Sequence, residues 1–290
     1  MGKSLLAAIA VVVSMSAVRM ADAAPPPATV HLLQAPAWLE RAGGRQALRP
    51  GSVLQNGDRI VTGAGARVVL ALAEGSLVKL GATATLALDD LVVPPDEAGL
   101  FRGFLDVVRG AFRFTTTLAG RQRDVRARVR TATIGIRGTD VWGKSETTRD
   151  FVVLLEGAIT VTRDGQEQTL DQPLSLFMAP RDRPVLPITT VATADLARWA
   201  QETEPQAGQG IVGGDGGFVL HLAEFAHLTD AQRLVTSLDA VGYAATVVPK
   251  GEGLHRVSIT GYASQADAVH DGAQLVRQQG LPAPRVGRGD

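Results

Sequence analysis

The last third of the chain alternates between two hydrophobic periodicities, and this alternation limits the folds that it can adopt. Short apolar runs at 218–222, 244–248 and 254–259 have the length and composition of β-strands. Two other segments have apolar residues every three or four positions, which is the period of a helix. These residues are Ala231, Leu234, Val235, Leu238 and Val241, and then Ala266, Val269, Ala273 and Val276. With a last short strand at 283–286, the predicted order is strand, helix, strand, strand, helix, strand.

This order predicts a small α+β unit built on one antiparallel sheet. Asp230 before the first helical stripe and Gly242 after it suit the two ends of a helix. Two half-units of this kind place both helices on one face of the sheet. The other face is then uncovered, and we expect it to act as a binding platform.

The residues of this region, 217–287, resemble the SPOR domain, a small peptidoglycan-binding module of bacterial envelopes. The resemblance rests on the sequences HLAEF at 221–225 and RVSITGY at 256–262. His221 stands where the family usually has Gln, and the second motif fits if one residue, Thr260, is extra. The resemblance implies binding to peptidoglycan glycan strands that lack stem peptides, which are enriched at division septa.

The candidate glycan-binding residues combine this resemblance with strand geometry. Alternate residues of a strand share a face, so Arg256 and Ser258 are expected on the open face, with Val257 and Ile259 directed to the helices. Phe225 either contacts the ligand or packs under a helix. The predicted glycan-binding set is His221, Phe225, Arg256, Ser258 and Tyr262.

Residues 29–180 read as a series of short strands separated by glycine-containing turns. Asn56-Gly57 is a strong signal for a tight turn, and no helical stripe longer than two turns appears. This pattern predicts an all-β sandwich or roll. The chain is therefore expected to be multidomain, with the β domain first and the small βαββαβ domain last.

The predicted β domain resembles the FecR domain. The matching pieces lie at 54–63, 108–114 and 129–141, and the last contains an Arg-Gly-Thr sequence. The best-known members are transmembrane regulators of iron-uptake sigma factors. The resemblance implies an extracytoplasmic interaction module, and an extracytoplasmic signalling regulator of the FecR type is one alternative function.

The N-terminal segment predicts export. Lys3 precedes an apolar run at 5–13, and Ala21-Asp22-Ala23 offers a cleavage site, so residues 1–23 are interpreted as a signal peptide. We expect a periplasmic protein, and anchoring in the membrane by an uncleaved N-terminus is the alternative. The absence of cysteine excludes a lipoprotein anchor and disulfides. Residues 181–216 are predicted as a linker with a short helix at 195–202 and a flexible, glycine-rich end.

The sequence contains no convincing motif for catalysis or for cofactor binding. Residues 138–145 match the phosphate-loop pattern, but Val141 and Trp142 favour an extended chain and no helical stripe follows. The histidines lack the spacing of a zinc site on one element, no G-x-S-x-G elbow is present, and the net charge of zero gives no reason to expect nucleic acid. We therefore predict no nucleotide, cofactor or metal and no enzymatic activity. A peptidoglycan hydrolase stays open as an alternative, because paired carboxylates across a cleft leave no sequence motif.

A strip of arginines in the β domain is the remaining candidate site. Arg126, Arg128 and Arg130 alternate with apolar residues, so strand geometry places them on one face. They form either a solvated surface or a basic strip for an anionic polymer or an envelope protein. Together these patterns predict a non-enzymatic periplasmic protein that binds peptidoglycan through its C-terminal domain.

Overall fold

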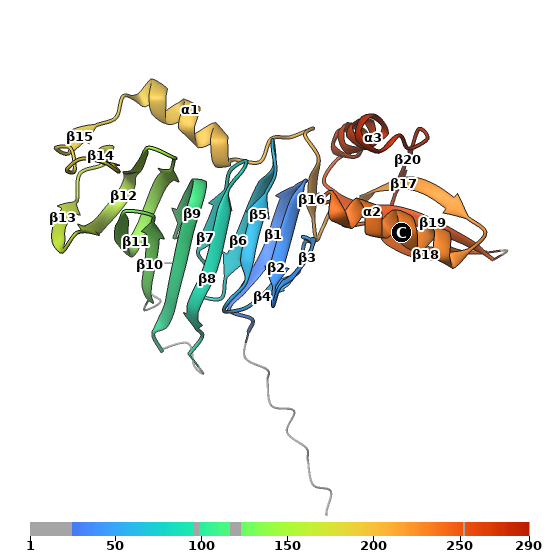
Figure 1. Cartoon of the computed structure of the whole chain (residues 1–290), viewed down its shortest axis with the longest axis horizontal. Helices are drawn as coiled ribbons and strands as arrows, with labels where there is room; N and C mark the ends of the chain where they lie inside the picture. The colour runs from blue at the N-terminus through green and yellow to red at the C-terminus, as the bar shows by residue number, and fades with distance from the viewer. Residues whose placement is uncertain (1–24, 95–98, 117–122, 252, 290) are drawn as a thin grey trace, which may run out of the picture.

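The computed structural model of the protein describes residues 25–94, 99–116, 123–251 and 253–289. The predicted signal peptide lies outside these residues. A β domain occupies one end of the molecule, and a smaller α+β domain occupies the other (Figure 1). In the part of the chain that the structure describes, no helix has both the length and the apolar character needed to span a membrane.

The N-terminal domain consists of two packed β-layers, as predicted. Its strands are β1 (Ala28–Gln34), β2 (Ala37–Arg41), β3 (Gly44–Ala47), β4 (Val53–Leu54), β5 (Arg59–Thr62), β6 (Arg67–Leu72), β7 (Leu77–Leu80), β8 (Thr85–Val92), β9 (Phe101–Thr115), β10 (Arg123–Val129), β11 (Ala132–Ser145), β12 (Arg149–Arg163), β13 (Gln166–Leu170) and β14 (Ser175–Pro180). One large hydrophobic core lies between the layers and includes Leu70, Phe112, Phe114 and Ile134.

Three long strands belong to both layers, because each bends at a glycine. The first half of β9 pairs with β8 and β10, and the second half pairs with β7 and β11. Gly110 in β9, Gly138 in β11 and Gly157 in β12 have φ angles of 92°, 62° and 85°, which favour glycine. The glycine of the Arg-Gly-Thr sequence is therefore a corner of the roll.

The phosphate-loop-like sequence at 138–145 forms part of β11 and is extended, as its composition predicts. Its residues 140–145 pair with β9 on one side and β12 on the other. The Lys144 ammonium group lies 2.9 Å from Glu202 and 3.3 Å from Glu146. The backbone of this segment is engaged in the sheet and does not curl into a phosphate cradle.

The segment between the domains packs against both of them. It contains β15 (Thr189–Thr190), α1 (Thr193–Thr203) and β16 (Ile211–Gly213). Trp199 of α1 stacks on Trp142 of β11, with ring centroids 5.4 Å apart and planes inclined by 9°. Beyond the helix, the Glu204 carboxylate accepts hydrogen bonds from Lys79 and Arg113.

The glycine-rich stretch 206–217 contains β16, whereas we expected a flexible linker. β16 pairs with β1, with Leu33 opposite Val212, and Val212 also pairs with Tyr262 of the C-terminal domain. The backbone N–H groups of Gly210 and Ile211 donate to Asp267 of the last helix. This strand therefore connects the sheets of the two domains.

The C-terminal domain has the predicted order of elements. These are β17 (Phe218–Phe225), α2 (Leu228–Ala240), β18 (Thr246–Lys250), β19 (Leu254–Tyr262), α3 (Gln265–Gln279) and β20 (Arg285–Arg288). The strands form an antiparallel sheet in the order β18–β19–β17–β20. Both helices pack on one face, around a core that includes Leu220, Leu238, Val257 and Leu275.

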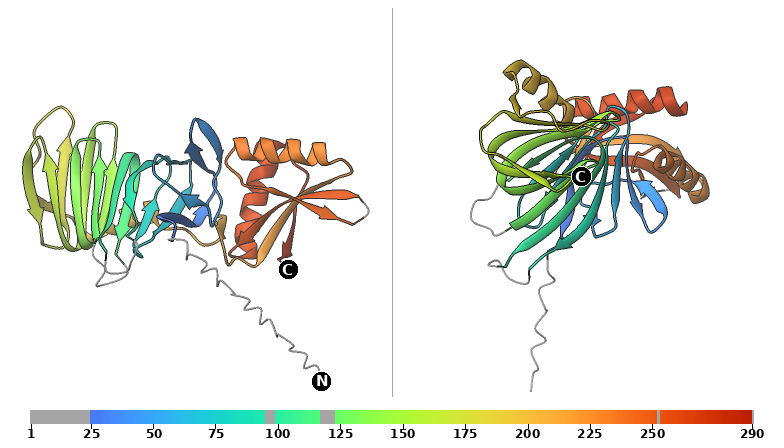
Figure 2. Two further views of the ribbon diagram at one scale, coloured as in Figure 1. Left: turned by 90° about the horizontal axis from the view of Figure 1, so that it is seen from below. Right: turned by 60° about the vertical axis from the view of Figure 1, so that its left-hand side comes forward.

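The two domains touch directly as well as through β16 (Figure 2). The Asp239 carboxylate of α2 accepts a 2.8 Å hydrogen bond from the backbone of Ala47. A Cβ atom on Gly242 would lie 2.8 Å from the ring of Trp38, so only glycine allows this close approach. These contacts fix how the C-terminal sheet faces the β domain.

Candidate binding cleft

The face of the C-terminal sheet opposite the helices carries polar side chains from three strands. His221 lies opposite Ser258, and Glu224 lies opposite Arg256. Lys250 of β18 also reaches this face, where its ammonium group contacts Glu224. The neighbouring residues of β19, Val257 and Ile259, are buried in the core, as the period of a strand predicts.

Two cations share one carboxylate on this face. Glu224 accepts hydrogen bonds from Lys250 at 2.9 Å and from Arg256 at 2.8 Å. The bond from Lys250 and then that from Arg256 lower the pKa of Glu224, so it is ionised at neutral pH. Arg285 of β20, opposite His221 in the register, is exposed and has no ion pair among the described residues. The charges of Lys250, Arg256 and Arg285 exceed that of Glu224, so these four side chains together carry a net charge of +2.

His221 and Ser258 hold each other in place. The Nδ1 atom of His221 lies 3.0 Å from Oγ of Ser258, whose residue is 2% exposed. Burial and then the charge of Arg256 lower the pKa of His221, so its ring is neutral at pH 7. A Cβ atom at Gly287 would lie 3.0 Å from Nε2 of His221, so the absence of a side chain there leaves room for the ring.

Two of the predicted residues are not on the open face, and a β-bulge explains each case. Tyr262 is fully buried, and its hydroxyl donates a 3.0 Å hydrogen bond to Asp271 of α3. The register shifts beside Gly261, whose φ of 87° makes it the extra residue that we had assigned to Thr260. One extra residue reverses the alternation of side chains, and Tyr262 turns to the helices.

Phe225 is displaced in the same way. The register of β17 shifts between His221 and Ala223, which leaves Leu222 without a partner residue on β19. Beyond the bulge, Glu224 faces the open side and Phe225 packs against the core. Of the predicted set, the structure therefore brings His221, Arg256 and Ser258 together on one face of the sheet. Tyr262 is buried and bonded to α3, but it borders the same cleft as these three residues. Phe225 packs against the core on the other side.

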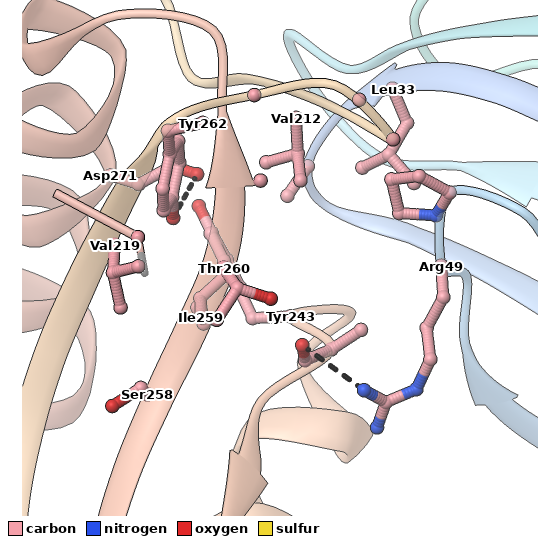
Figure 3. Close-up of a pocket in the computed structure, with 18 of the residues that line it drawn as sticks. Leu33, Arg49, Val212, Val219, Tyr243, Ser258, Ile259, Thr260, Tyr262 and Asp271 are labelled. Carbon is pink, nitrogen blue, oxygen red and sulfur yellow. Dashed lines mark hydrogen bonds between the residues drawn. The ribbon is translucent and has the colours of Figure 1, made fainter.

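A cleft of about 680 Å³ runs along part of this face, and the β domain supplies its other wall. Leu48, Arg49 and Pro50 line it from the β domain. Figure 3 shows Arg49 across the space from Ser258 and Thr260 of β19. A second hollow of about 520 Å³ lies on the same face, and both hollows are bordered by His221 and Arg256. The second hollow is also lined by Glu224, Lys250 and Arg285.

Sequence reasoning missed several residues of this site: Arg49, Glu224, Lys250 and Arg285. Lys250 and Arg285 lie at strand ends, where charged residues are ordinary, so neither gives a signal by itself. Glu224 lies inside the HLAEF sequence, and only the bulge places it beside Arg256. Arg49 belongs to another domain, and only the packing of the two domains brings it to the cleft.

The arginine strip of the β domain is largely neutralised. Arg126, Arg128 and Arg130 are all exposed on one face of β10 and the turn that follows it. Arg126 forms an ion pair with Asp124, and Arg128 forms one with Asp106. Two of the three charges therefore have partners within the domain.

Comparisons with known proteins identify two domains. Residues 58–160 match the family model FecR protein, and residues 214–284 match the SPOR domain. The chain thus contains a FecR domain followed by a SPOR domain. Both are binding or regulatory families associated with the bacterial envelope. No curated protein matches the chain.

Two crystal structures of a "putative anti-sigma factor" from Parabacteroides distasonis ATCC 8503 are also similar to the chain. The first, at 1.65 Å resolution, is 16% identical, with a TM-score of 0.40; the match covers 49% of this chain and 64% of that protein. The second, at 2.50 Å resolution, is 15% identical, with a TM-score of 0.40; the match covers 76% of this chain and 91% of that protein.

Proposed function

We propose that this protein is a non-enzymatic component of the periplasm that binds peptidoglycan glycan strands lacking stem peptides. The SPOR domain supplies the binding face, and the FecR domain acts as an interaction module. The observation that carries the proposal is the polar, positively charged face of the C-terminal sheet beside two hollows. Glycan strands without stem peptides are enriched at division septa, so we expect the protein to concentrate there.

The chemistry of such strands matches this face. Removal of the stem peptide by an amidase frees the lactyl carboxylate of each muramic acid, so the glycan gains one negative charge per disaccharide. Arginine binds carboxylates through paired N–H donors, and Arg285 is available for this on the open face. Arg256 adds positive charge beside it, although Nε and one terminal nitrogen of its guanidinium group contact Glu224. The neutral ring of His221 supplies a further hydrogen-bonding group beside them.

The direct test is binding of the full chain to purified sacculi before and after amidase treatment. We expect strong retention only on treated sacculi. Arg285→Ala removes a cation that has no partner among the described residues, and the loss of a charge-assisted hydrogen bond of about 1.5–3 kcal/mol weakens binding tenfold or more. Arg277→Ala is the matched control, because Arg277 is exposed on α3, on the helix-covered side.

Equal retention on treated, untreated and mock material would contradict the proposal. The same preparations also test for enzymatic activity. We expect no soluble muropeptides after incubation of sacculi with the protein, whatever the pH and metal content. Fractionation of cells tests the compartment, and we expect the processed chain in the periplasmic fraction.

A second candidate function is an extracytoplasmic signalling regulator, which the FecR match over 58–160 favours. This function requires retention of the N-terminus in the membrane and a partner that controls transcription. Recovery of the chain from the membrane fraction together with a sigma factor would support it. A soluble, processed chain without such a partner would exclude it.

A further inference from the structure

We propose that the FecR domain forms part of the glycan site, with Arg49 and Pro50 as a second wall that contacts the bound strand. The inference rests on the proposed function and deepens it. A glycan is then held between the two domains, and the SPOR sheet alone provides only half of the site.

The first observation is the composition of the larger cleft. Residues 48–50 lie between β3 and β4 of the β domain, ahead of the stretch 58–160 that matches the FecR family, and they line the cleft together with Thr260 and Val219 of the SPOR sheet. The larger cleft has a volume of about 680 Å³, which is in the range that proteins use for drug-sized ligands. A disaccharide repeat of the glycan is a molecule of that size. A strand that enters this space meets both walls.

The second observation is that the wall is held in position before any ligand binds. The Arg49 guanidinium group donates to the backbone oxygen of Ala245 at 2.9 Å and to that of Ala244 at 3.4 Å. Nearby, the Asp239 carboxylate accepts the backbone N–H of Ala47. Because β16 also pairs with strands of both domains, the cleft is preorganised, and preorganisation reduces the cost of binding.

The third observation is the charge of the wall. Arg49 has no carboxylate partner among the described residues, and its two bonds to carbonyl groups leave further N–H donors. Arg256 and Arg288 line the same cleft, so three arginines border it. Among the described residues that line the cleft, Asp271 is the one acidic residue, and it is buried against Tyr262.

These charges fit a polymer with repeated carboxylates. Arg288 on the sheet and Arg49 on the wall offer guanidinium groups from two directions, and Arg256, which also contacts Glu224, adds to the positive charge. Pro50 and Val219 border the same space with apolar side chains. A glycan that retains its stem peptides has its lactyl carboxylates blocked as amides, so it offers no carboxylate at these positions to the guanidinium groups. The wall therefore adds to the selectivity for strands without peptides.

The test measures the dissociation constant of the full chain for soluble glycan oligomers prepared by amidase digestion. Arg49→Gln removes the charge and keeps hydrogen-bond donors for Ala244 and Ala245. Pro50→Glu places a negative charge on the wall, and among the described residues Pro50 takes part in no hydrogen bond between the domains. We expect each variant to bind about tenfold more weakly, as for the loss of one charge-assisted contact. Arg59→Gln, an exposed arginine of β5, is the control.

The fluorescence of Trp38, which packs against Gly242 across the domain contact, shows whether the variants keep the domains docked. If Arg49→Gln undocks them, Pro50→Glu decides the question. Suppose that the docked Arg49→Gln and Pro50→Glu both bind with the affinity of the parent, while Arg285→Ala loses binding. This result overturns the proposal that Arg49 and Pro50 contact the glycan, and it leaves the proposed function intact. Failure of the parent chain to bind the oligomers at all overturns the proposed function itself.

Discussion

The stability of the SPOR domain is expected to fall as the pH rises toward 8, because of one buried carboxyl group. Asp271 of α3 is 2% exposed. Burial raises its pKa to about 8; the hydrogen bond from Tyr262 opposes this shift, and the charge of Asp267 adds to it. The group is therefore neutral in the folded protein at pH 7, whereas it is ionised in the unfolded chain.

The size of the effect follows from the shift of the pKa. The change from 3.8 to about 8 is roughly four units, and each unit corresponds to about 1.4 kcal/mol. Between these two values the folded state binds the additional proton, so the free energy of unfolding decreases as the pH increases. The total loss approaches 5–6 kcal/mol, which is comparable to the whole stability of a small domain.

Urea unfolding of the full chain between about pH 4 and pH 8, followed by the helical circular dichroism signal, measures how the free energy of unfolding changes with pH. The helical signal is suitable because α2 and α3 both belong to the SPOR domain. Asp271→Asn has no charge to bury, so we expect it to be more stable than the parent at pH 8 and to lose most of the pH dependence. Asp215→Asn, at an exposed position before β17, is the control. An unchanged slope in Asp271→Asn would refute the reasoning.

Three further substitutions test the packing that positions the site. Gly216→Ala places a Cβ atom 2.0 Å from a backbone oxygen, so we expect a lower melting temperature and undocked domains by fluorescence. Gly214→Ala is the control, because a Cβ atom there meets nothing within 4 Å, and we expect it to leave both readouts unchanged. Trp199→Ala uncovers the buried ring of Trp142, so the tryptophan emission is expected to shift to the red, and an unshifted spectrum would contradict the packing. Asp150→Asn removes a fully buried charge that pairs with an arginine, at a cost of about 3–5 kcal/mol in thermal unfolding; a loss below 1 kcal/mol would be inconsistent with this pairing.

The order of elements in the SPOR domain could be predicted because it depends on local periodicity. The face of each side chain could be predicted only where the alternation is unbroken. Arg256 and Ser258 lie within one regular stretch of β19 and share the expected face, although Ser258 is buried there beside His221. Phe225 and Tyr262 lie beyond bulges, and each bulge reverses the alternation. The fold depends on the average pattern, whereas the site depends on single insertions.

The FecR domain illustrates a second limit of sequence reasoning. Its short strands and glycine turns predict a roll, and the structure is a two-layered roll. The sequence does not reveal that β9, β11 and β12 are each long strands that bend between the layers. Gly110 and Gly157 lie inside these strands, where a glycine reads as a turn between two shorter ones. The bend is a tertiary feature, because a strand changes partners there while its hydrogen-bonded ladder continues.

The segment between the domains shows why composition alone predicts the wrong behaviour. A glycine-rich stretch is expected to be flexible when its glycines are solvated. Here a Cβ atom on Gly210 would lie 2.3 Å from Asp271, and one on Gly216 would lie 2.0 Å from the backbone of Gly261. Gly210 leaves room for the Asp271 side chain, and Gly216 lets two backbones approach, so that β16 can pair with both sheets. That pairing sets the distance between Arg49 and the SPOR sheet. The proposed two-walled site therefore depends on close packing within the glycine-rich stretch 206–217, whose composition resembles that of a flexible linker.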